Sequence, residues 1–326
     1  MSGEPGSGAA TVLHGAGGRN VAGGRRIRAE RSRNGAVPAP SLGSAGPPYR
    51  PRGPLVPDAV TDELGAQVTL PEVPRRIVSL VPSLSEALWW FRVSDRVVGL
   101  TDYCVAPPHG FPAATRVRGT KNPDTAAIAD LEPDLVLANE EENRRIDVER
   151  LRDAGVPVYV TAPRSVPDAA RTLATVGALV GEEGAGAGLA QAIERALDQL
   201  VSGGRPDPLR TFCPIWRDPW MATGRDTYAA DLLAWTGFEV VPVVPGERYP
   251  QVDLDAVRAL DPDVVLLPDE PYAFGRSDRQ AFADWRARTR LVDGTQLTWY
   301  GPRTPYALAE FGRRNRELRR RVPTRP

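Results

Sequence analysis

Two clusters of acidic residues follow two apolar runs of the sequence, DLVLAN and DVVLLP. Glu140, Glu141 and Glu142 follow the first run, and Asp269 and Glu270 follow the second. Paired carboxylates can act as general acid and base or bind a hard cation. Catalysis would also need a nucleophile or base arranged beside them, and the sequence offers none. The alternative is that the first cluster stabilises the N-terminus of the helix expected after it.

Two tryptophans flank a basic residue in the stretch CPIWRDPW. Trp216 and Trp220 stand four residues apart, with Arg217 and Pro219 between them. Indole rings can stack on a flat ligand, and a guanidinium adds cation–π or anion contacts. Burial of both rings as a seal between loop and sheet is the alternative. The segment is therefore a candidate ligand contact.

Two basic residues occupy similar places in two G-x-x-x-P segments, GTKNP at 119–123 and GERYP at 246–250. Lys121, the only lysine of the chain, lies in the first, and Arg248 lies in the second. A lysine and an arginine could clamp an anionic group. Solvated surface positions would explain them equally well.

Cysteine and histidine are too few to build a metal or disulfide framework. The chain has two cysteines, Cys104 and Cys213, and two histidines, and none forms a C-x-x-C or H-E-x-x-H pattern. We expect both thiols to be buried and inert. His109 could ligate the metal of a bound chelate, although a lone loop histidine rarely does. The prediction is that the protein needs no cofactor and has no metal site of its own.

Length and charge exclude two classes of partner. The 326 residues suffice for two domains, and the 41 basic residues balance the 41 acidic ones. Without a basic field, binding to nucleic acid is not expected. No run of about 18 apolar residues exists, so no membrane-spanning segment is expected.

The N-terminal segment 1–55 is rich in Gly, Ala, Arg, Ser and Pro. It has too little apolar surface to order itself, and we expect it to be disordered. It also lacks the apolar stretch of a signal peptide, which predicts a cytoplasmic protein. A mis-set start codon would instead allow an extracytoplasmic one.

Short apolar strands alternate with helices from residue 76 onward. RIVSLV, RVVGLTDY, DLVLAN and PVYVTA read as strands. Between the first two, Ser83 and Glu86 are expected to form a capping box, and Asn122 to cap a helix that starts at Pro123. Strand–helix alternation of this kind predicts a parallel sheet covered on both faces.

The same order restarts after residue 205, and part of the sequence repeats. LEPDLVLANEE at 131–141 and LDPDVVLLPDE at 260–270 match at an offset of 129 residues. This indicates an internal repeat, although the turn pattern x-P-D is common enough to arise by coincidence. An apolar helical stripe joins the halves. We therefore predict an α/β fold of two Rossmann-like lobes, 56–181 and 205–326, joined by one long helix at 182–204.

Ligands of open parallel sheets bind beyond the carboxyl ends of the strands. With two facing lobes, those ends should define one shared cleft. The residues expected to line it are Pro82, Ser83, Asp102, Tyr103, Lys121, Asn122, Glu141, Trp216, Arg217, Trp220, Thr223, Arg225, Arg248, Tyr249, Glu270 and Trp299.

The segments RRIVSLVPSLSEAL, VVGLTDYCVAPP, IWRDPWMATGRDTYAADLLAWTG and YPQVDLDAVRALDPDVVLLPDEPY resemble the class III substrate-binding proteins. These are the corrinoid and ferric-siderophore receptors of ABC importers, and the likeness covers about residues 60–312. It implies a lower ligand wall at Pro82, Ser83 and Tyr103 and an upper wall at 216–223 with Tyr249 and Pro250. Thr120 stands where the corrinoid receptors carry a stacking tryptophan.

The resemblance also implies an ABC permease as partner. The family docks through one acidic residue on each lobe, and these positions fall at Ala126 and Asp255 here. We therefore expect a monomeric, non-catalytic binding protein for a small ligand, a corrinoid or another metal chelate such as a siderophore. The alternatives are a secreted importer receptor and a cytosolic enzyme that uses the facing carboxylates.

Overall fold

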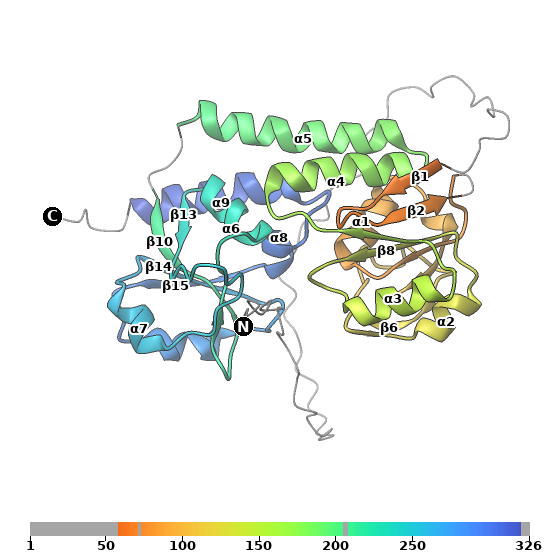
Figure 1. Cartoon of the computed structure of the whole chain (residues 1–326). Coiled ribbons are helices and arrows are strands. Elements are labelled where there is room, and N and C mark those ends of the chain that lie inside the picture. The colour runs from red at the N-terminus through yellow and green to blue at the C-terminus, as the bar shows by residue number, and fades with distance from the viewer. Residues whose placement is uncertain (1–57, 71–72, 205–207, 321–326) are drawn as a thin grey trace, which may run out of the picture. The chain divides into compact units, whose positions relative to one another are not determined.

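The computed structural model describes residues 58–70, 73–204 and 208–320 (Figure 1). All of them belong to one compact unit, residues 41–326. The segment 1–55, for which disorder is expected, lies outside the described residues. Within the described ranges no helix combines the length and the apolar character that crossing a bilayer requires.

The N-terminal lobe is built on a parallel sheet of five strands in the order β5-β4-β3-β8-β9. Its strands are β3 (Ile77–Ser79), β4 (Val97–Leu100), β5 (Thr115–Arg116), β8 (Leu135–Asn139) and β9 (Val158–Thr161). Its short helices are α1 (Pro82–Trp90), η1 (Ser94–Arg96), α2 (Thr125–Asp130) and α3 (Arg145–Asp153). A two-stranded ribbon, β6 (Arg118–Gly119) with β7 (Asn122–Pro123), precedes α2. The parallel sheet predicted from the strand–helix alternation is confirmed.

The C-terminal lobe is built on a parallel sheet of four strands in the order β13-β10-β14-β15. Its strands are β10 (Leu209–Phe212), β13 (Phe238–Val240), β14 (Val264–Pro268) and β15 (Arg288–Val292), with a hairpin of β11 (Pro214–Trp216) and β12 (Met221–Ala222). Its helices are α6 (Tyr228–Trp235), α7 (Leu254–Ala259), η2 (Arg276–Phe282), α8 (Gly294–Thr298) and α9 (Thr304–Arg319).

Helix α5 (Glu183–Ser202) connects the lobes and packs along α4 (Val166–Leu179), as Figure 1 shows. The two helices approach closely where two glycines meet: a Cβ on Gly177 would lie 2.6 Å from the Cα of Gly186. Helix α4 also touches the C-terminal lobe, because the N–H of Val166 donates to the Asp231 carboxylate of α6 at 2.7 Å. The expected single connecting helix is present, and α4 reinforces it.

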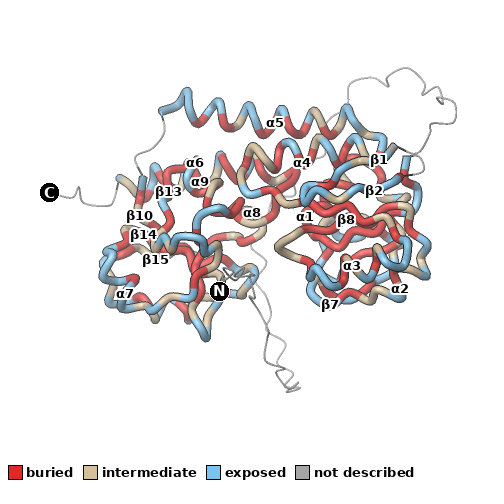
Figure 2. The backbone as a smooth tube through the Cα atoms, in the orientation of Figure 1, coloured by how far each residue is buried: buried red, intermediate tan, exposed pale blue. Residues whose placement is uncertain are grey.

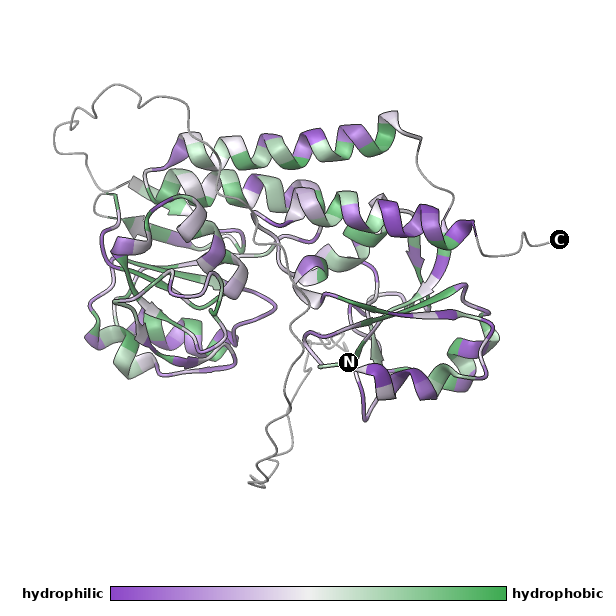
Figure 3. Ribbon diagram, turned by 180° about the vertical axis from the view of Figure 1, so that it is seen from behind, coloured by the Kyte–Doolittle hydropathy of each residue, from purple (hydrophilic) through white to green (hydrophobic). Residues whose placement is uncertain are grey.

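Part of the core runs through both lobes. The central strands β8 and β14 are buried at every position (Figure 2), and they are mainly hydrophobic, whereas the helices carry both kinds of residue (Figure 3). One cluster of buried apolar side chains includes Leu84 of α1, Leu173 of α4, Ile193 of α5, Leu233 of α6 and Phe311 of α9. A large movement of one lobe against the other would expose part of this cluster, which is unfavourable.

An antiparallel hairpin, β1 (Asp58–Thr61) with β2 (Gln67–Leu70), covers the outer edge of the N-terminal sheet. The N–H of Glu63 donates to the carbonyl of Val160 in the edge strand β9 at 3.1 Å. The buried carboxylate of Asp62 accepts from Arg152 at 2.6 Å and from two backbone N–H groups of its own turn. Pairing and covering an edge strand in this way protects it from other strands.

The internal repeat appears in the structure as two equivalent units. Helices α2 and α7, and strands β8 and β14, each stand 129 residues apart. Both helices are capped by aspartate side chains, Asp124 and Asp253, and both are followed by a residue with positive φ, Glu132 at 44° and Asp261 at 49°. Agreement in caps and backbone angles favours duplication over coincidence.

Two predicted helix starts are wrong. Helix α1 begins at Pro82 with Val81 as a cap that makes no side-chain hydrogen bond, so Ser83 lies inside the helix and forms no capping box with Glu86. Pro82 sets this start, because its fixed φ suits the first helical turn. Asn122 belongs to the ribbon β7, and the cap of α2 is Asp124, whose carboxylate accepts from the backbone N–H of Ala127.

Candidate functional site

The lobes are tied together by polar contacts at the carboxyl ends of the strands. The phenol of Tyr300, from the C-terminal lobe, lies 3.0 Å from Nδ2 of Asn139 and 2.8 Å from Oγ1 of Thr161. Arg303 Nε donates to Oε2 of Glu86 at 2.7 Å. Asn139 and Thr161 are the last residues of β8 and β9, so the C-terminal lobe reaches the strand ends where ligands of parallel sheets bind.

A carboxylate of the N-terminal lobe is bound by two donors of the C-terminal lobe. Arg248 Nη1 donates to Oε1 of Glu141 at 2.8 Å, and the Tyr249 phenol donates to Oε2 at 2.5 Å. Each carboxylate oxygen therefore has its own donor. Charge-assisted contacts of this geometry are among the stronger hydrogen bonds in proteins.

Neighbouring charges extend this contact. Oε2 of Glu140 lies 3.3 Å from Arg248 and 2.9 Å from Arg164. The Lys121 ammonium donates to the backbone carbonyl of Glu141. The pairing of Lys121 and Arg248 around one site agrees with their equivalent places in the two G-x-x-x-P segments.

The loop after β8 is held in place by two asparagines. Asn139 Oδ1 accepts from the backbone N–H groups of Glu141 and Glu142, at 2.8 and 3.2 Å. Asn143 Oδ1 accepts from the N–H of Asn139 at 2.8 Å, and its Nδ2 donates to the carbonyl of Thr120 at 3.0 Å. Asparagine side chains commonly satisfy backbone groups of a tight loop in this way.

On the other lobe, Gly224 fixes the segment that carries Arg248. The N–H of Gly224 donates to the Arg248 carbonyl at 2.8 Å, and a Cβ at Gly224 would lie 2.6 Å from the carbonyl oxygen of Glu247. Only glycine permits this close approach. Both loops are therefore supported by their own lobe before they meet.

Burial shifts the acidity of several groups around this contact. It raises the pKa of Glu142 to about 7, although the Lys121 ammonium opposes the shift. Burial raises the pKa of Glu270, against the hydrogen bond from Trp299 Nε1 at 3.0 Å. Burial, followed by the negative charge of Glu141, raises the pKa of Tyr249 well above its ordinary value. The phenol of Tyr249 therefore stays protonated at neutral pH and donates to Glu141.

The raised pKa of Glu142 predicts a pH-dependent stability. The folded value of about 7 lies above the ordinary value of 4.5, so the stabilising contribution is present below pH 4.5 and is lost as pH rises through 7. Relative to Glu142→Gln, the free energy of unfolding of the wild-type protein should fall by on the order of 2 kcal/mol between pH 5 and pH 8. This is less than the full pKa shift implies, because part of the side chain remains solvated. Urea unfolding of both proteins at pH 5 and 8 measures this, and parallel pH profiles would contradict it.

The two tryptophans of CPIWRDPW differ in their surroundings. Trp216 is 42% exposed and meets Tyr272 edge-on, with ring centroids 5.6 Å apart. Trp220 stacks on Phe274 at 5.9 Å and packs edge-on against Phe282 at 5.5 Å. Trp220 therefore belongs to the packing of its lobe, whereas the Trp216 ring remains available for contact. Ligand binding by either ring stays a prediction.

Arg217 holds the turn between these tryptophans. Its Nη1 donates to the buried carboxylate of Asp278 at 2.6 Å, and its guanidinium lies 5.6 Å from the centroid of the Trp220 ring. The hydrogen bond from Gly275, then that from Arg217, lowers the pKa of Asp278. The charge of Arg217 is thus already matched within its own lobe.

The structure brings together one subset of the predicted site residues: Lys121, Glu141, Arg248 and Tyr249. Glu270 accepts a hydrogen bond from Trp299, and the negative charge of Glu270 contributes to the raised pKa of Glu142. Among the described residues, no hydrogen bond or ion pair links the following predicted residues to Glu141: Pro82, Ser83, Asp102, Tyr103, Asn122, Trp216, Arg217, Trp220, Thr223 and Arg225. Of these, Tyr103 is 63% exposed, Ser83 and Thr223 are buried, and Arg225 lies 3.7 Å from Glu239.

Several residues at the lobe junction escaped prediction. Glu86 was assigned to a helix cap, and Thr161 and Arg303 were not singled out. Arg164, which binds Glu140 within the N-terminal lobe, was not singled out either. Arg164 follows directly after β9 in the stretch TAPRS, so its place at a strand end could have identified it. Arg303 precedes α9 in the stretch GPRTP, and no pattern distinguishes it from the other arginines of the chain.

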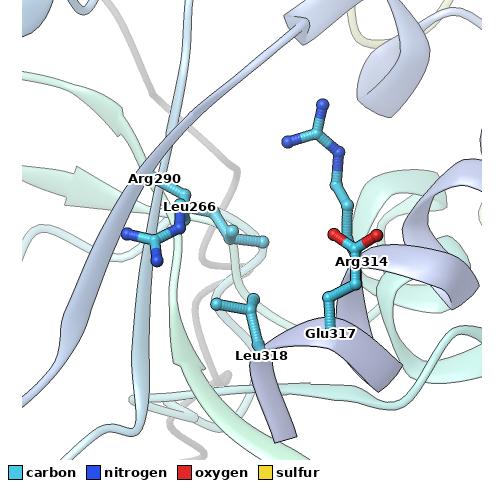
Figure 4. A pocket seen from close by; sticks show the side chains of 5 residues that line it. All are labelled: Leu266, Arg290, Arg314, Glu317 and Leu318. Atoms are coloured by element: carbon cyan, nitrogen blue, oxygen red, sulfur yellow. The ribbon is translucent and has the colours of Figure 1, made fainter. Parts of the chain in front are cut away.

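A small surface pocket lies elsewhere, between β14, β15 and α9 (Figure 4). It is lined by Leu266, Arg290, Arg314, Glu317 and Leu318, and includes none of the interlobe residues. Across residues 58–70, 73–204 and 208–320, no group of three or more His, Cys, Asp or Glu side chains is arranged to hold a metal ion.

Comparison with known proteins identifies the family. The model of the family described as periplasmic binding protein matches residues 77–291, which is more than half of the chain. The chain belongs to the periplasmic binding protein family. Its two parallel sheets and connecting helix α5 are the fold expected from the class III substrate-binding proteins, and both the resemblance and the fold prediction are confirmed.

Individual members of the periplasmic binding protein family support this assignment. An uncharacterized ABC transporter substrate-binding lipoprotein of Bacillus subtilis, YvrC, is 26% identical over 79% of this chain and 85% of its own length. The crystal structure of the vitamin B12 binding protein BtuF of Vibrio cholerae covers 76% of this chain and 98% of its own, with a TM-score of 0.68 and 20% identity. The apo heme-binding protein RhuT of Roseiflexus sp. RS-1 covers 75% and 98%, with a TM-score of 0.66 and 24% identity. At these identities the solved structures show the fold alone, and the names of all three relatives describe binding proteins.

Proposed function

We propose that this protein binds one small ligand between its two lobes, without chemistry, and that the ligand is a corrinoid or another metal chelate such as a siderophore. The observation that carries the proposal is the meeting of Arg248 and Tyr249 with Glu141 at the strand ends of the two lobes. Parallel sheets bind their ligands at this edge. The vitamin B12 and heme binding proteins named above support a metal chelate as the ligand class.

The binding mechanism that we propose is complementarity between an apolar face and a few polar groups. Trp216 supplies exposed aromatic area, and Lys121 and Arg248 supply the positive charge nearest the lobe junction. Arg217 and Arg225 contribute less than their sequence positions indicate, because each already lies beside a carboxylate of its own lobe. The ligand itself brings any metal, and the chain needs no cofactor.

We further propose that an ABC permease receives the ligand. The relative YvrC is named as a substrate-binding lipoprotein of such a transporter. Ala126 of α2 and Asp255 of α7 stand 129 residues apart, so they occupy equivalent places on the two repeat units. Only the C-terminal lobe carries an acidic residue there. An enzyme that uses the facing carboxylates is less favoured, because Glu141 is already bound by Arg248 and Tyr249.

Direct titration tests the proposed function. Cyanocobalamin and hemin are added separately to the purified full chain, and absorbance and native mass spectrometry follow the complex. A one-to-one complex with one of them is expected, and it should resist dilution to micromolar concentration. Protein purified from its own cells should also carry a coloured chelate. The proposal would be contradicted if both cyanocobalamin and hemin fail to bind and the protein purified from its own cells is colourless.

A further inference from the structure

Arg248 and Tyr249 converge on a single carboxylate group. They are neighbours in the sequence, and their donor atoms contact different oxygens of Glu141, at 2.8 and 2.5 Å. A guanidinium and a protonated phenol that address both oxygens of one carboxylate make a site that recognises this group by shape and charge. The carboxylate comes from the opposite lobe, so it is not part of the fold that supports the two donors.

The support for the donors is independent of Glu141. Gly224 holds the backbone of Arg248 within the C-terminal lobe. Glu141 stands on the loop fixed by Asn139 in the N-terminal lobe. The Arg248 and Glu141 side chains each keep about a quarter of their surface exposed, at 27%. Solvent, and an anion dissolved in it, can therefore reach both partners.

We propose that Arg248 and Tyr249 form a carboxylate-binding subsite of the ligand site, which Glu141 occupies until a carboxylate of the ligand displaces it. This rests on the proposed function and narrows it to ligands that carry a free carboxylate. Glu141 acts as an internal competitor, because only molecules whose subsite is free of Glu141 can bind the carboxylate of the ligand. The apparent affinity is therefore the intrinsic affinity multiplied by the fraction of such molecules. Glu141 is thus a specificity-determining residue, because a ligand without an anionic group cannot replace the hydrogen bonds that Glu141 makes with Arg248 and Tyr249.

Citrate titration tests this subsite without the complete ligand. Isothermal titration of citrate into the full chain compares wild type, Glu141→Ala and Glu247→Ala. We expect the citrate dissociation constant to be at least ten-fold lower for Glu141→Ala than for wild type, because the competitor is gone. Glu247 is exposed and adjacent to Arg248, so its replacement removes the same charge nearby but leaves Glu141 bound. It should leave citrate binding within about two-fold of wild type, since an exposed charge acts weakly through solvent.

A double variant shows where the anion binds. Adding Arg248→Ala to Glu141→Ala should abolish the gain in citrate affinity, and Glu141→Gln should show a smaller gain than Glu141→Ala if the amide still accepts from one donor. Equal citrate affinity in wild type and Glu141→Ala overturns the proposal, as does a gain that survives the loss of Arg248 or appears equally in Glu247→Ala. Failure of the proposed function is a separate result: citrate would bind Glu141→Ala while cyanocobalamin and hemin bind no variant.

Discussion

Replacement of Asp62 by alanine is expected to lower the free energy of unfolding by about 3–5 kcal/mol, as loss of one partner of a buried ion pair does. The Asp62 carboxylate is fully buried and accepts from Arg152 at 2.6 Å. It also accepts from the N–H groups of Leu64 and Ala66 in the hairpin turn and from Val160 in the edge strand. Alanine would leave these donors without their acceptor and loosen the hairpin from β9.

An exposed ion pair provides the matched control for Asp62. Arg145 Nε lies 2.5 Å from Glu149, but their side chains are 91% and 44% exposed. Glu149→Ala should therefore change the free energy of unfolding by less than about 0.5 kcal/mol. Urea unfolding followed by circular dichroism measures both variants. A loss below about 1 kcal/mol for Asp62→Ala would show that the hairpin contributes little to the N-terminal lobe.

The sequence predicted the fold well because the fold depends on local patterns. The apolar runs at 135–139 and 264–268 became fully buried strands, and the repeated x-P-D turn placed aspartates before both of them. Asp134 accepts from the N–H of Arg76, and Asp263 accepts from the N–H of Arg210. Each contact joins a helix-to-strand turn to the start of the first strand of its parallel sheet, β3 or β10. The repetition in sequence therefore reflects a repeated structural requirement.

Partners of charged side chains were harder to predict, because they depend on distant parts of the chain. Arg217 was expected to contact a ligand, but its carboxylate partner, Asp278, stands 61 residues later. Glu86 was assigned to a helix cap, but it binds Arg303, 217 residues later. No local pattern distinguishes an arginine that has such a partner from one that is free.

The pairing of Lys121 with the loop after β8 was easier to predict, because it depends on the repeated sequence pattern. The G-x-x-x-P segments and the strand ends are both set by the repeat, which places Lys121 and Arg248 near the same acidic loop. What the sequence did not show is which residues of the C-terminal lobe bind Glu141. The acidic cluster was expected to face the acidic residues after β14, and the charge of Glu270 does contribute to the raised pKa of Glu142. Glu141, however, accepts from Arg248 and Tyr249, and these donors offset the repulsion between the two acidic clusters.

Trp220→Ala is expected to lower the free energy of unfolding by about 3 kcal/mol, at the lower end of the range for large aromatic truncations. The ring stacks on Phe274 and packs against Phe282, so its removal leaves a cavity in the C-terminal lobe. Trp216→Ala should cost less than about 1 kcal/mol, because that ring is 42% exposed and touches mainly Tyr272. Urea unfolding of both variants measures the difference.

Ligand affinity should respond in the opposite order. If Trp216 is the aromatic wall of the proposed site, Trp216→Ala should weaken binding of the cognate chelate by about 2 kcal/mol, as loss of an aromatic anchor does. Folded Trp220→Ala should bind almost as well as wild type. Phenylalanine at each position is the control: it preserves an aromatic face, so Trp220→Phe should recover much of the stability and Trp216→Phe much of the affinity. Unchanged affinity in Trp216→Ala would remove this ring from the site, and the exposed ring of Tyr103 would then be the remaining aromatic candidate on the opposite lobe.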